Sequence, residues 1–259
     1  MKWWVLLFLL GVVSLPAAVS AIGTGGQLER VQKHRSRVAV PGHDDQHEWT
    51  SSFDLGASLA KGNSDALFLT ASLTIDKEFG DDEIFGNFTY AYGEDNRETT
   101  TDELLATASW ARLLKDNWYF GFRLDGRYDQ LANIDYRVAT TGYGGKYLLK
   151  SEDTQLSFEA GVGYTFEKQG MPDDYFTLYA GERFNHWFND YVRLYQSVAF
   201  FAAAEEPADY QMISDLGLET FLSASLSFKV YAQNKYESRP AAGSQENDFK
   251  LVSGISWKF

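Results

Sequence analysis

LSFEAGVGYTFE, residues 156–167, contains the pattern that decides the fold. Apolar side chains occupy every second position, and the positions between them carry polar residues or glycine. A period of two is typical of a β-strand that has one apolar and one polar face. About ten such residues are enough to cross a membrane as a tilted strand in a barrel wall. The stretch therefore predicts a membrane-crossing strand.

The same period extends in both directions from this stretch, from Trp49 to Phe259. It predicts an all-β protein, a transmembrane antiparallel up-and-down β-barrel of about twelve strands. Alternation breaks in the third, fourth and sixth strands, where we expect β-bulges. The expected strands are 49–61, 66–80, 83–93, 101–114, 117–128, 135–149, 154–167, 174–188, 191–203, 209–221, 225–237 and 247–259.

Every second connection between these strands is tight. The tight set comprises 80–82, 115–117, 151–153, 189–190 and 222–224, whereas the other set includes longer connections at 94–100, 168–173, 205–208 and 238–246. Outer-membrane barrels have short periplasmic turns and longer outer loops. The tight set is therefore expected in the periplasm and the longer set outside, with 62–65 as a short outer turn.

The tryptophans after the N-terminal segment support this orientation, because aromatic rings collect at membrane–water interfaces. All five fall at strand ends on the expected periplasmic side, and they predict a periplasmic aromatic girdle of Trp49, Trp110, Trp118, Trp187 and Trp257. The last strand ends in Phe259, with apolar residues at the preceding alternate positions. We interpret this end as the signal by which outer-membrane assembly machinery recognises the chain.

The N-terminus resembles an export signal. Lys2 precedes an apolar run, and the small residues Val19 and Ala21 suit cleavage after Ala21. The run is short for a membrane-anchor helix, which needs roughly 20 apolar residues. We expect a signal peptide at 1–21, a flexible periplasmic segment at 22–48, and an outer-membrane barrel at 49–259 in a Gram-negative bacterium.

Composition excludes several classes of function. The sequence has no cysteine, which excludes thiol chemistry and disulfides, and no histidine–acid spacing is specific for a metal. The formal net charge of −13 disfavours nucleic acid, whose binding needs clustered cations. We therefore expect no cofactor, no metal site and no nucleic-acid partner; the expected partners are outer-membrane lipid, lipopolysaccharide and the assembly machinery.

The alternation also assigns charged residues to the inside of the barrel. Two interpretations remain open: a lumen filled by ion pairs, or a narrow polar pore whose opposed charges set selectivity. Strand number does not decide between them. The expected lumen-facing charges are Asp54, Arg123, Asp125, Arg127, Glu159, Arg183, Arg193, Asp215, Glu219, Lys229 and Lys250.

Three further features have more than one interpretation. Glu182 and Gln196 fall on the apolar outward face, so we expect either a bulge that turns Glu182 inward or a subunit contact that covers it. His186 is the one histidine of the barrel region; it falls on the outward face, and no serine is obviously placed to form a lipid-hydrolase site with it. The outer loops are acidic, which is usual for a solvated surface, and divalent cations shared with lipopolysaccharide are the alternative.

Between Phe53 and Phe259 the chain resembles the salt-induced outer-membrane protein family, a family of unknown function. The resemblance rests on residues 61–65, 134–137, the glycines 142, 144 and 145, residues 156–164, 182–184 and 257–259. It implies a barrel in the outer membrane and brings no substrate or catalytic residue. We expect a non-enzymatic structural barrel or a narrow pore for small solutes and ions. The alternatives are a lipid-modifying hydrolase, a receptor or adhesin with a plugged barrel, and a soluble periplasmic sandwich.

Overall fold

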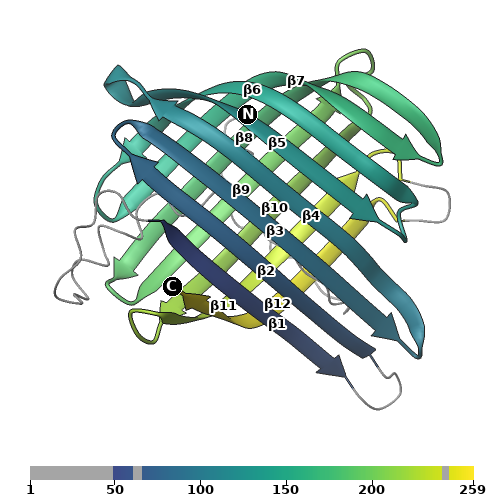
Figure 1. Cartoon of the computed structure of the whole chain (residues 1–259), viewed down its shortest axis with the longest axis horizontal. Coiled ribbons are helices and arrows are strands. Elements are labelled where there is room, and N and C mark those ends of the chain that lie inside the picture. Colours follow the sequence, from purple (N-terminus) through teal and green to yellow (C-terminus); the bar gives the residue numbers. More distant parts are fainter. Residues whose placement is uncertain (1–48, 61–65, 241–244) are drawn as a thin grey trace, which may run out of the picture.

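The computed structural model describes residues 49–60, 66–240 and 245–259. In this part the chain forms a closed antiparallel barrel of twelve strands, in which each strand pairs with its neighbours in sequence and β1 pairs with β12 (Figure 1). The strands are β1 (Thr50–Ala60), β2 (Ala66–Phe79), β3 (Asp82–Asp95), β4 (Glu98–Leu113), β5 (Trp118–Asp129), β6 (Ile134–Lys150), β7 (Thr154–Gln169), β8 (Met171–Asn189), β9 (Val192–Ala203), β10 (Tyr210–Phe221), β11 (Leu226–Glu237) and β12 (Asn247–Lys258).

This architecture confirms the predicted barrel and its strand number. The largest boundary differences are three residues, at the starts of β4 and β8. The expected signal peptide, the segment 22–48 and the turn at 62–65 lie outside the described residues. No helix in the described ranges is both long and apolar enough to cross a membrane.

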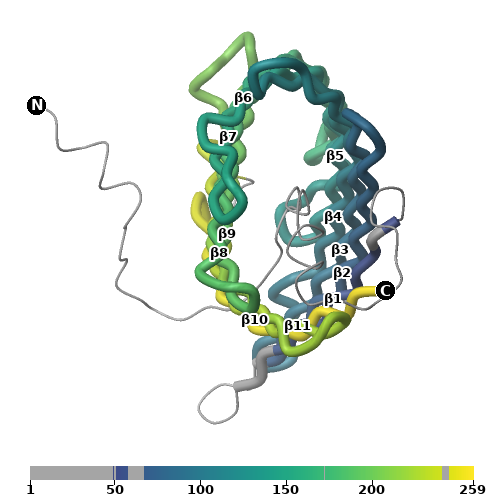
Figure 2. Tube along the Cα trace, turned by 90° about the vertical axis from the view of Figure 1, so that its left-hand side faces the viewer, coloured from purple at the N-terminus to yellow at the C-terminus, as the bar shows by residue number. Residues whose placement is uncertain are grey.

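The barrel has two distinct ends. We call the end that carries Trp49 and Phe259 the terminal end and the opposite one the loop end. The terminal end carries the tight connections, including a short 3₁₀ turn at Lys115–Asn117. Viewed near its axis, the barrel is an oval ring in which β1–β5 form one long wall and β7–β11 the other (Figure 2). This flattening brings opposite walls within reach of long side chains.

Two loop-end connections are shorter than the sequence predicts. β3 and β4 join through Asn96 and Arg97, whose φ angles are 49° and 68°, and Asp95 pairs with Glu98 across this hairpin. β7 and β8 join at Gly170, where φ is +77°, a conformation that glycine adopts without strain. The prediction of long loops at 94–100 and 168–173 is therefore wrong. Their polar residues continue the strands instead, because pairing does not require an apolar face.

Register shifts occur near strand ends rather than at mid-strand. They lie between Gly93 and Glu94 in the β3–β4 pair, between Arg127 and Asp129 in β5–β6, at both ends of the β6–β7 pair, and between Trp187 and Asn189 in β8–β9. They account for the broken alternation at the ends of β3, β4 and β6. The central part of each strand keeps one inward and one outward face.

The seam between β1 and β12 is short. Its pairs run only from Ser52–Lys258 to Gly56–Gly254, whereas β1 pairs with β2 along its whole length. At the terminal end the seam is extended by reciprocal backbone hydrogen bonds between Ser51 and Phe259, of 3.1 and 2.9 Å. Closure of the barrel is therefore concentrated at its terminal end.

The exterior is apolar, whereas the interior combines apolar side chains with many buried polar and charged ones. Val162 is 66% exposed and Phe122 is 63% exposed, although both lie in the middle of paired strands. Large apolar side chains like these cover the outer surface of all twelve strands. One example from each strand, in order from β1 to β12, is Phe53, Leu69, Phe88, Leu104, Phe122, Leu148, Phe158, Phe176, Leu194, Leu216, Phe228 and Leu251. An apolar surface this extensive is far larger than a soluble monomer exposes.

Candidate functional site in the barrel lumen

The expected lumen charges lie on the inward faces of their strands. Glu159, Arg193, Asp215, Glu219 and Lys250 are buried, and the remaining six are half-buried. The structure sorts them into separate groups. Arg127 and Lys250 join one network at the loop end, Arg193 and Glu219 another at the terminal end, and the other members make separate contacts.

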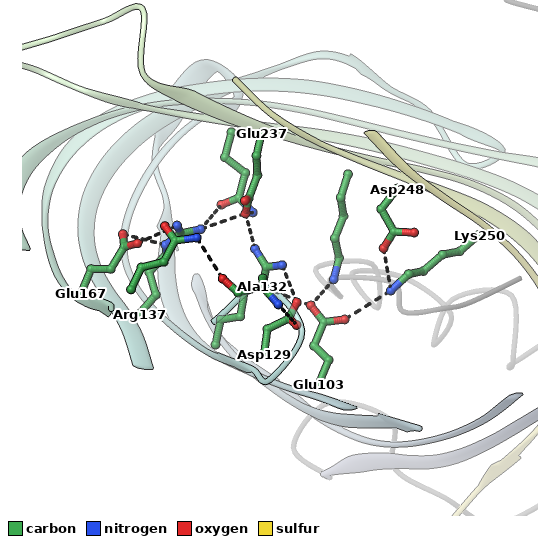
Figure 3. A network of polar contacts seen from close by, with 12 residues as sticks. Glu103, Asp129, Ala132, Arg137, Glu167, Glu237, Asp248 and Lys250 are labelled. Atoms are coloured by element: carbon green, nitrogen blue, oxygen red, sulfur yellow. Dashed lines mark hydrogen bonds and ion pairs between the residues drawn. The ribbon is translucent and has the colours of Figure 1, made fainter. Parts of the chain in front are cut away.

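The loop-end network is built around Glu103 of β4, whose side chain is 1% exposed. Arg127 of β5 donates from Nε at 3.1 Å, Lys250 of β12 lies 3.4 Å away, and Lys235 of β11 forms the third ion pair. The two lysines come from β11 and β12, neither of which is a neighbour of β4 in the sheet, and Figure 3 shows Lys250 extending toward Glu103. The pairs therefore cross the lumen instead of joining neighbouring strands.

A second part of the same network extends to β6 and β7. Arg137 binds Glu167 through two hydrogen bonds of 2.8 Å each, and Tyr175 donates to Glu167 at 2.9 Å. Glu237 of β11 accepts from both Arg127 and Arg137 and so joins the two parts (Figure 3). The loop-end network comprises Glu103, Arg127, Asp129, Arg137, Glu167, Gln211, Lys235, Glu237, Asp248 and Lys250.

The terminal-end network is centred on Glu219 of β10, which is fully buried. Arg193 of β9 donates to it at 2.6 Å, Ser227 of β11 at 2.6 Å and Lys258 of β12 at 2.9 Å. Lys258 is the penultimate residue of the chain, and its ammonium lies 3.7 Å from the centroid of the Phe221 ring. This network thus ties the last strand to the inside of the barrel.

A tyrosine cluster of Tyr119, Tyr143, Tyr147 and Tyr179 lines the lumen between β5 and β8, and Tyr119 and Tyr147 place part of it near the terminal end. Tyr119 donates to Glu159 at 2.9 Å, and Tyr179 and Arg183 donate to the same carboxylate. Glycine makes room for the rings, because Tyr119 pairs with Gly145 across the β5–β6 ladder. A Cβ atom at Gly145 would collide with the Tyr119 ring. A larger residue there would push the ring away from the wall and farther into the lumen.

Other polar contacts line the wall between these groups. Arg123 binds Asp125 two residues along β5 at 2.6 and 2.7 Å. Lys229 of β11 reaches Asp54 of β1 at 2.6 Å and so spans β12. Gln233 donates to Asp215 at 2.8 Å. Each of the predicted lumen charges therefore has an opposite charge or a hydrogen-bond partner inside the barrel.

Cavities remain between the networks. One of about 100 Å³ lies at the loop end beside Arg127, Arg137 and Glu237. Another of about 110 Å³ lies beside Asp54 and Lys229, and a third of about 170 Å³ opens near the tight turn at Gly80. Arg123 borders the first cavity and Arg183 the third, and both guanidiniums lie about 6 Å from rings of the tyrosine cluster. Side chains therefore divide the lumen into small compartments.

Sequence reasoning missed several members of the networks: Glu103, Arg137, Glu167, Lys235, Glu237 and Lys258. Lys235 and Lys258 follow the inward alternation of their strands, and this signal could have identified them. Arg137 lies beside a register shift, where counting alternate positions fails. Glu103 precedes two consecutive leucines, Leu104 and Leu105, which hide the alternation of the strand. The cross-lumen partners are separated by 100 or more residues and could not be paired by pattern.

The expected aromatic girdle is not uniform. Trp49, Trp118 and Trp257 are exposed at the terminal end, and Trp110 is partly exposed there, stacked on Phe122 at 6.1 Å. Trp187 lies at the same end but is only 8% exposed, because it points inward and stacks on Phe221 at 5.2 Å. Its assignment to the girdle is wrong. Phe259 is 69% exposed.

Glu182 and Gln196 remain on the outward face. The β8–β9 register is continuous from Thr177 to Trp187, so no bulge turns Glu182 inward, and that hypothesis is wrong. The two residues are diagonal rather than opposite, since Glu182 pairs with Val198 and Gln196 with Phe184. Gln196 donates to the Glu182 carboxylate at 3.3 Å. This contact satisfies part of the hydrogen-bonding capacity of a carboxylate on an apolar surface.

His186 lies on the outward face near the terminal end. Its Nδ1 is 2.9 Å from Thr154 Oγ1, and its ring packs edge-on against Phe188 at 4.9 Å. The hydrogen-bond partner is thus a threonine, placed by the β7–β8 register.

The loop end carries exposed acids and few cations. Arg239 forms ion pairs with Glu206 and, at 3.9 Å, with Asp209. The Arg239 guanidinium lowers the pKa of Glu206. Within residues 49–60, 66–240 and 245–259, no group of three or more acidic or histidine side chains has a geometry suited to a metal ion.

A closed antiparallel barrel with an apolar exterior and a polar interior defines the class of membrane β-barrels. The chain belongs to the family described as "Protein of unknown function, DUF481", whose model matches residues 53–259. That description names neither an activity nor a response to salt. No curated protein matches the chain significantly.

Solved structures with a similar fold are outer-membrane barrels. The NanC porin is 10% identical, with a TM-score of 0.53 over 80% of this chain and 100% of that one. An outer membrane channel from Pseudomonas putida is 9% identical, with a TM-score of 0.52 over 83% of this chain and 96% of that one. At such low identity the likeness shows the shared barrel fold alone.

Proposed function

We propose that this protein is an outer-membrane β-barrel that forms a narrow pore for ions and small solutes, and that the loop-end network is its constriction. Its location is supported by the exposed apolar exterior, which only a lipid environment covers on all sides. The export signal expected at 1–21 and the assembly signal expected at Phe259 stay predictions, and both would direct the chain to the outer membrane of a Gram-negative bacterium. In the orientation predicted from the tight turns, the terminal end faces the periplasm.

The ion pairs that cross the lumen are the observation that carries the pore assignment. Burying a charge is expensive, and apolar residues of similar volume often replace a buried ion pair without loss of stability. A barrel with a purely structural role could therefore be filled by apolar side chains. This lumen instead holds opposed charges on facing walls, as in pores that select ions with charged side chains.

Lys235 is the best position at which to test the constriction. It bridges the lumen from β11 to Glu103 on β4, and Glu103 keeps Arg127 and Lys250 when Lys235 is removed. We expect Lys235→Ala to fold and to raise single-channel conductance in planar bilayers roughly twofold or more. The loss of a cation should also shift the reversal potential toward cation selectivity.

Lys115→Ala is the matched control, because Lys115 is exposed in the tight turn after β4 and lies outside the lumen. It should leave the conductance of the wild-type barrel unchanged. If the wild-type and Lys235→Ala barrels both fold, as judged by heat-modifiable gel mobility, and both remain silent, the pore assignment fails. A plugged structural barrel or receptor would then be the better interpretation.

A lipid hydrolase is less well supported. Such a site needs a nucleophile, a base and oxyanion donors that converge. His186 contacts Thr154 and two phenylalanine rings on the outward face, so the residues around it favour a position at the membrane interface. Unchanged lipid composition in a His186→Ala strain would be in keeping with a non-enzymatic role.

A further inference from the structure

We propose that Arg127, Arg137 and Gln211 form a binding site for small carboxylates, and that the chain's own Glu237 occupies this site as an internal ligand. As a statement about binding, the inference stands without conduction. As a statement about the solutes that the pore admits, it rests on the proposed function.

Three donors from three strands converge on one carboxylate oxygen. Arg127 Nη1 of β5 lies 2.5 Å from Glu237 Oε1, Arg137 Nη1 of β6 lies 3.1 Å from it, and Gln211 Nε2 of β10 lies 3.2 Å from it. Charge-assisted hydrogen bonds of this kind are the strong ones. We call these three residues the carboxylate cradle.

Other acids hold the cradle in place from behind. Arg127 uses its Nε and Nη2 atoms on Glu103 and Asp129, at 3.1 and 2.7 Å. Arg137 uses its Nε and Nη2 atoms on Glu167, at 2.8 Å each. Each guanidinium therefore presents its remaining Nη1 atom toward Glu237. The two guanidiniums keep these other partners when Glu237 is absent, so the charged part of the cradle is preorganised for another carboxylate.

Glu237 differs from the acids that support the cradle. It is the last residue of β11, next to the connection that leads to β12. Its side chain is 15% exposed, whereas that of Glu103 is 1% exposed. The cavity of about 100 Å³ is lined by all four residues, Arg127, Arg137, Gln211 and Glu237. A small carboxylate in that cavity could thus contact the same donors.

Part of the remaining lining of this cavity suits the carbon skeleton of an organic acid. It includes Phe201, Ala202 and Ile213, which offer apolar contacts beside the charged donors. Inorganic anions would gain nothing from these contacts. The site therefore favours a small organic carboxylate.

Glu237 is covalently attached beside the cradle, and this attachment determines how strongly an external carboxylate can compete with it for the cradle. A group held beside its site acts at a high effective concentration, of order millimolar or more. In the wild-type protein a free carboxylate must exceed this concentration to displace Glu237. Removal of the Glu237 side chain should therefore reveal binding at much lower concentrations.

Chemical rescue of Glu237→Ala by acetate tests the site. Thermal unfolding of the detergent-solubilised barrel is followed while sodium acetate replaces sodium chloride at constant ionic strength, with acetamide as the uncharged probe. We expect acetate to raise the Tm of Glu237→Ala saturably, at concentrations at least about tenfold below any effect on the wild type. Acetamide should have no effect, and the double variant Glu237→Ala/Arg137→Gln should lose the response.

Glu206→Ala is the control, because it frees the exposed guanidinium of Arg239 instead of the cradle. The proposal is wrong if Glu237→Ala responds to acetate no more than Glu206→Ala or no more than it responds to acetamide. Should Glu237→Ala fail to fold, Glu237→Ser also removes the carboxylate and leaves the cradle open, and it too must show a saturable acetate response that the wild type lacks.

Bilayer recordings separate this inference from the proposed function. If the barrel conducts, acetate should return the conductance of Glu237→Ala toward the wild-type value, and acetamide should not. A saturable Tm response in a silent barrel would leave the carboxylate site standing and reject the pore. Conduction without any saturable Tm response would reject the site and keep the pore.

Discussion

Glu103→Gln should destabilise the barrel by about 3–5 kcal/mol, the cost of removing one partner from a buried ion pair. Glu103 faces Arg127, Lys235 and Lys250, and its side chain is 1% exposed. The substitution changes the shape of the side chain little but leaves three cations in the lumen without their shared carboxylate. The effect should therefore exceed that of any substitution that removes one of these cations.

Unfolding by denaturant in lipid vesicles measures this loss. The double variant Glu103→Gln/Lys235→Gln provides the matched comparison, because it removes one cation together with the carboxylate. We expect it to be more stable than Glu103→Gln alone. A loss below about 1 kcal/mol for Glu103→Gln would mean that water or ions already compensate these charges, as at exposed salt bridges.

Val162→Arg should cost about 2–4 kcal/mol if the outer surface of the barrel lies in lipid. Val162 is 66% exposed near the middle of β7, so an arginine there has ample space and disturbs no packed core. Its cost would come from placing a charge in hydrocarbon, which depends on depth. The same free energy of unfolding in lipid vesicles reports it.

Met171→Arg is the control for this prediction. Met171 is 81% exposed at the loop end, where β8 begins. An arginine at this rim should cost no more than about 1 kcal/mol. Equal and small effects at Val162 and Met171 would contradict a lipid-facing surface at mid-barrel.

The sequence predicts the barrel well because each strand reports its own two faces. Phe158 and Val162 point outward and Glu159 points inward, as the alternation of β7 requires. Neighbouring strands are also adjacent in sequence, so the order of the sheet follows from the connections. The facing and the order of the strands are local properties, so local sequence patterns predict them.

The arrangement of the lumen is not a local property. Alternation indicates that Lys235 points inward, but the flattened cross-section and the stagger of the strands decide that it meets Glu103 on the far wall. The consecutive apolar residues Leu104 and Leu105 hide the facing of Glu103. Trp187 shows the same limit, because its position along β8 suited a girdle while the facing of its strand placed it inside.

Polarity also misled the prediction of the loops. The segments 94–100 and 168–173 are polar, which is typical of loops, yet most of their residues extend paired strands. Polarity misled the prediction for Glu182 as well. A polar residue on an apolar face suggested a bulge, but Glu182 stays on the outward face and accepts a hydrogen bond from Gln196. Side-chain polarity therefore reports the surroundings of a residue less reliably where a strand leaves the apolar zone.

The orientation of side chains along β7 is the most direct test of the whole account, which requires the outward face of a closed barrel to lie in lipid. The sequence contains no cysteine, so single cysteines can be placed at each position from 158 to 165 and labelled with a nitroxide in lipid vesicles. We expect accessibility to oxygen, which concentrates in lipid, to peak at Phe158, Ala160, Val162 and Tyr164 and to fall at the positions between them. Equal accessibility to a water-soluble relaxation reagent on both faces would contradict the account.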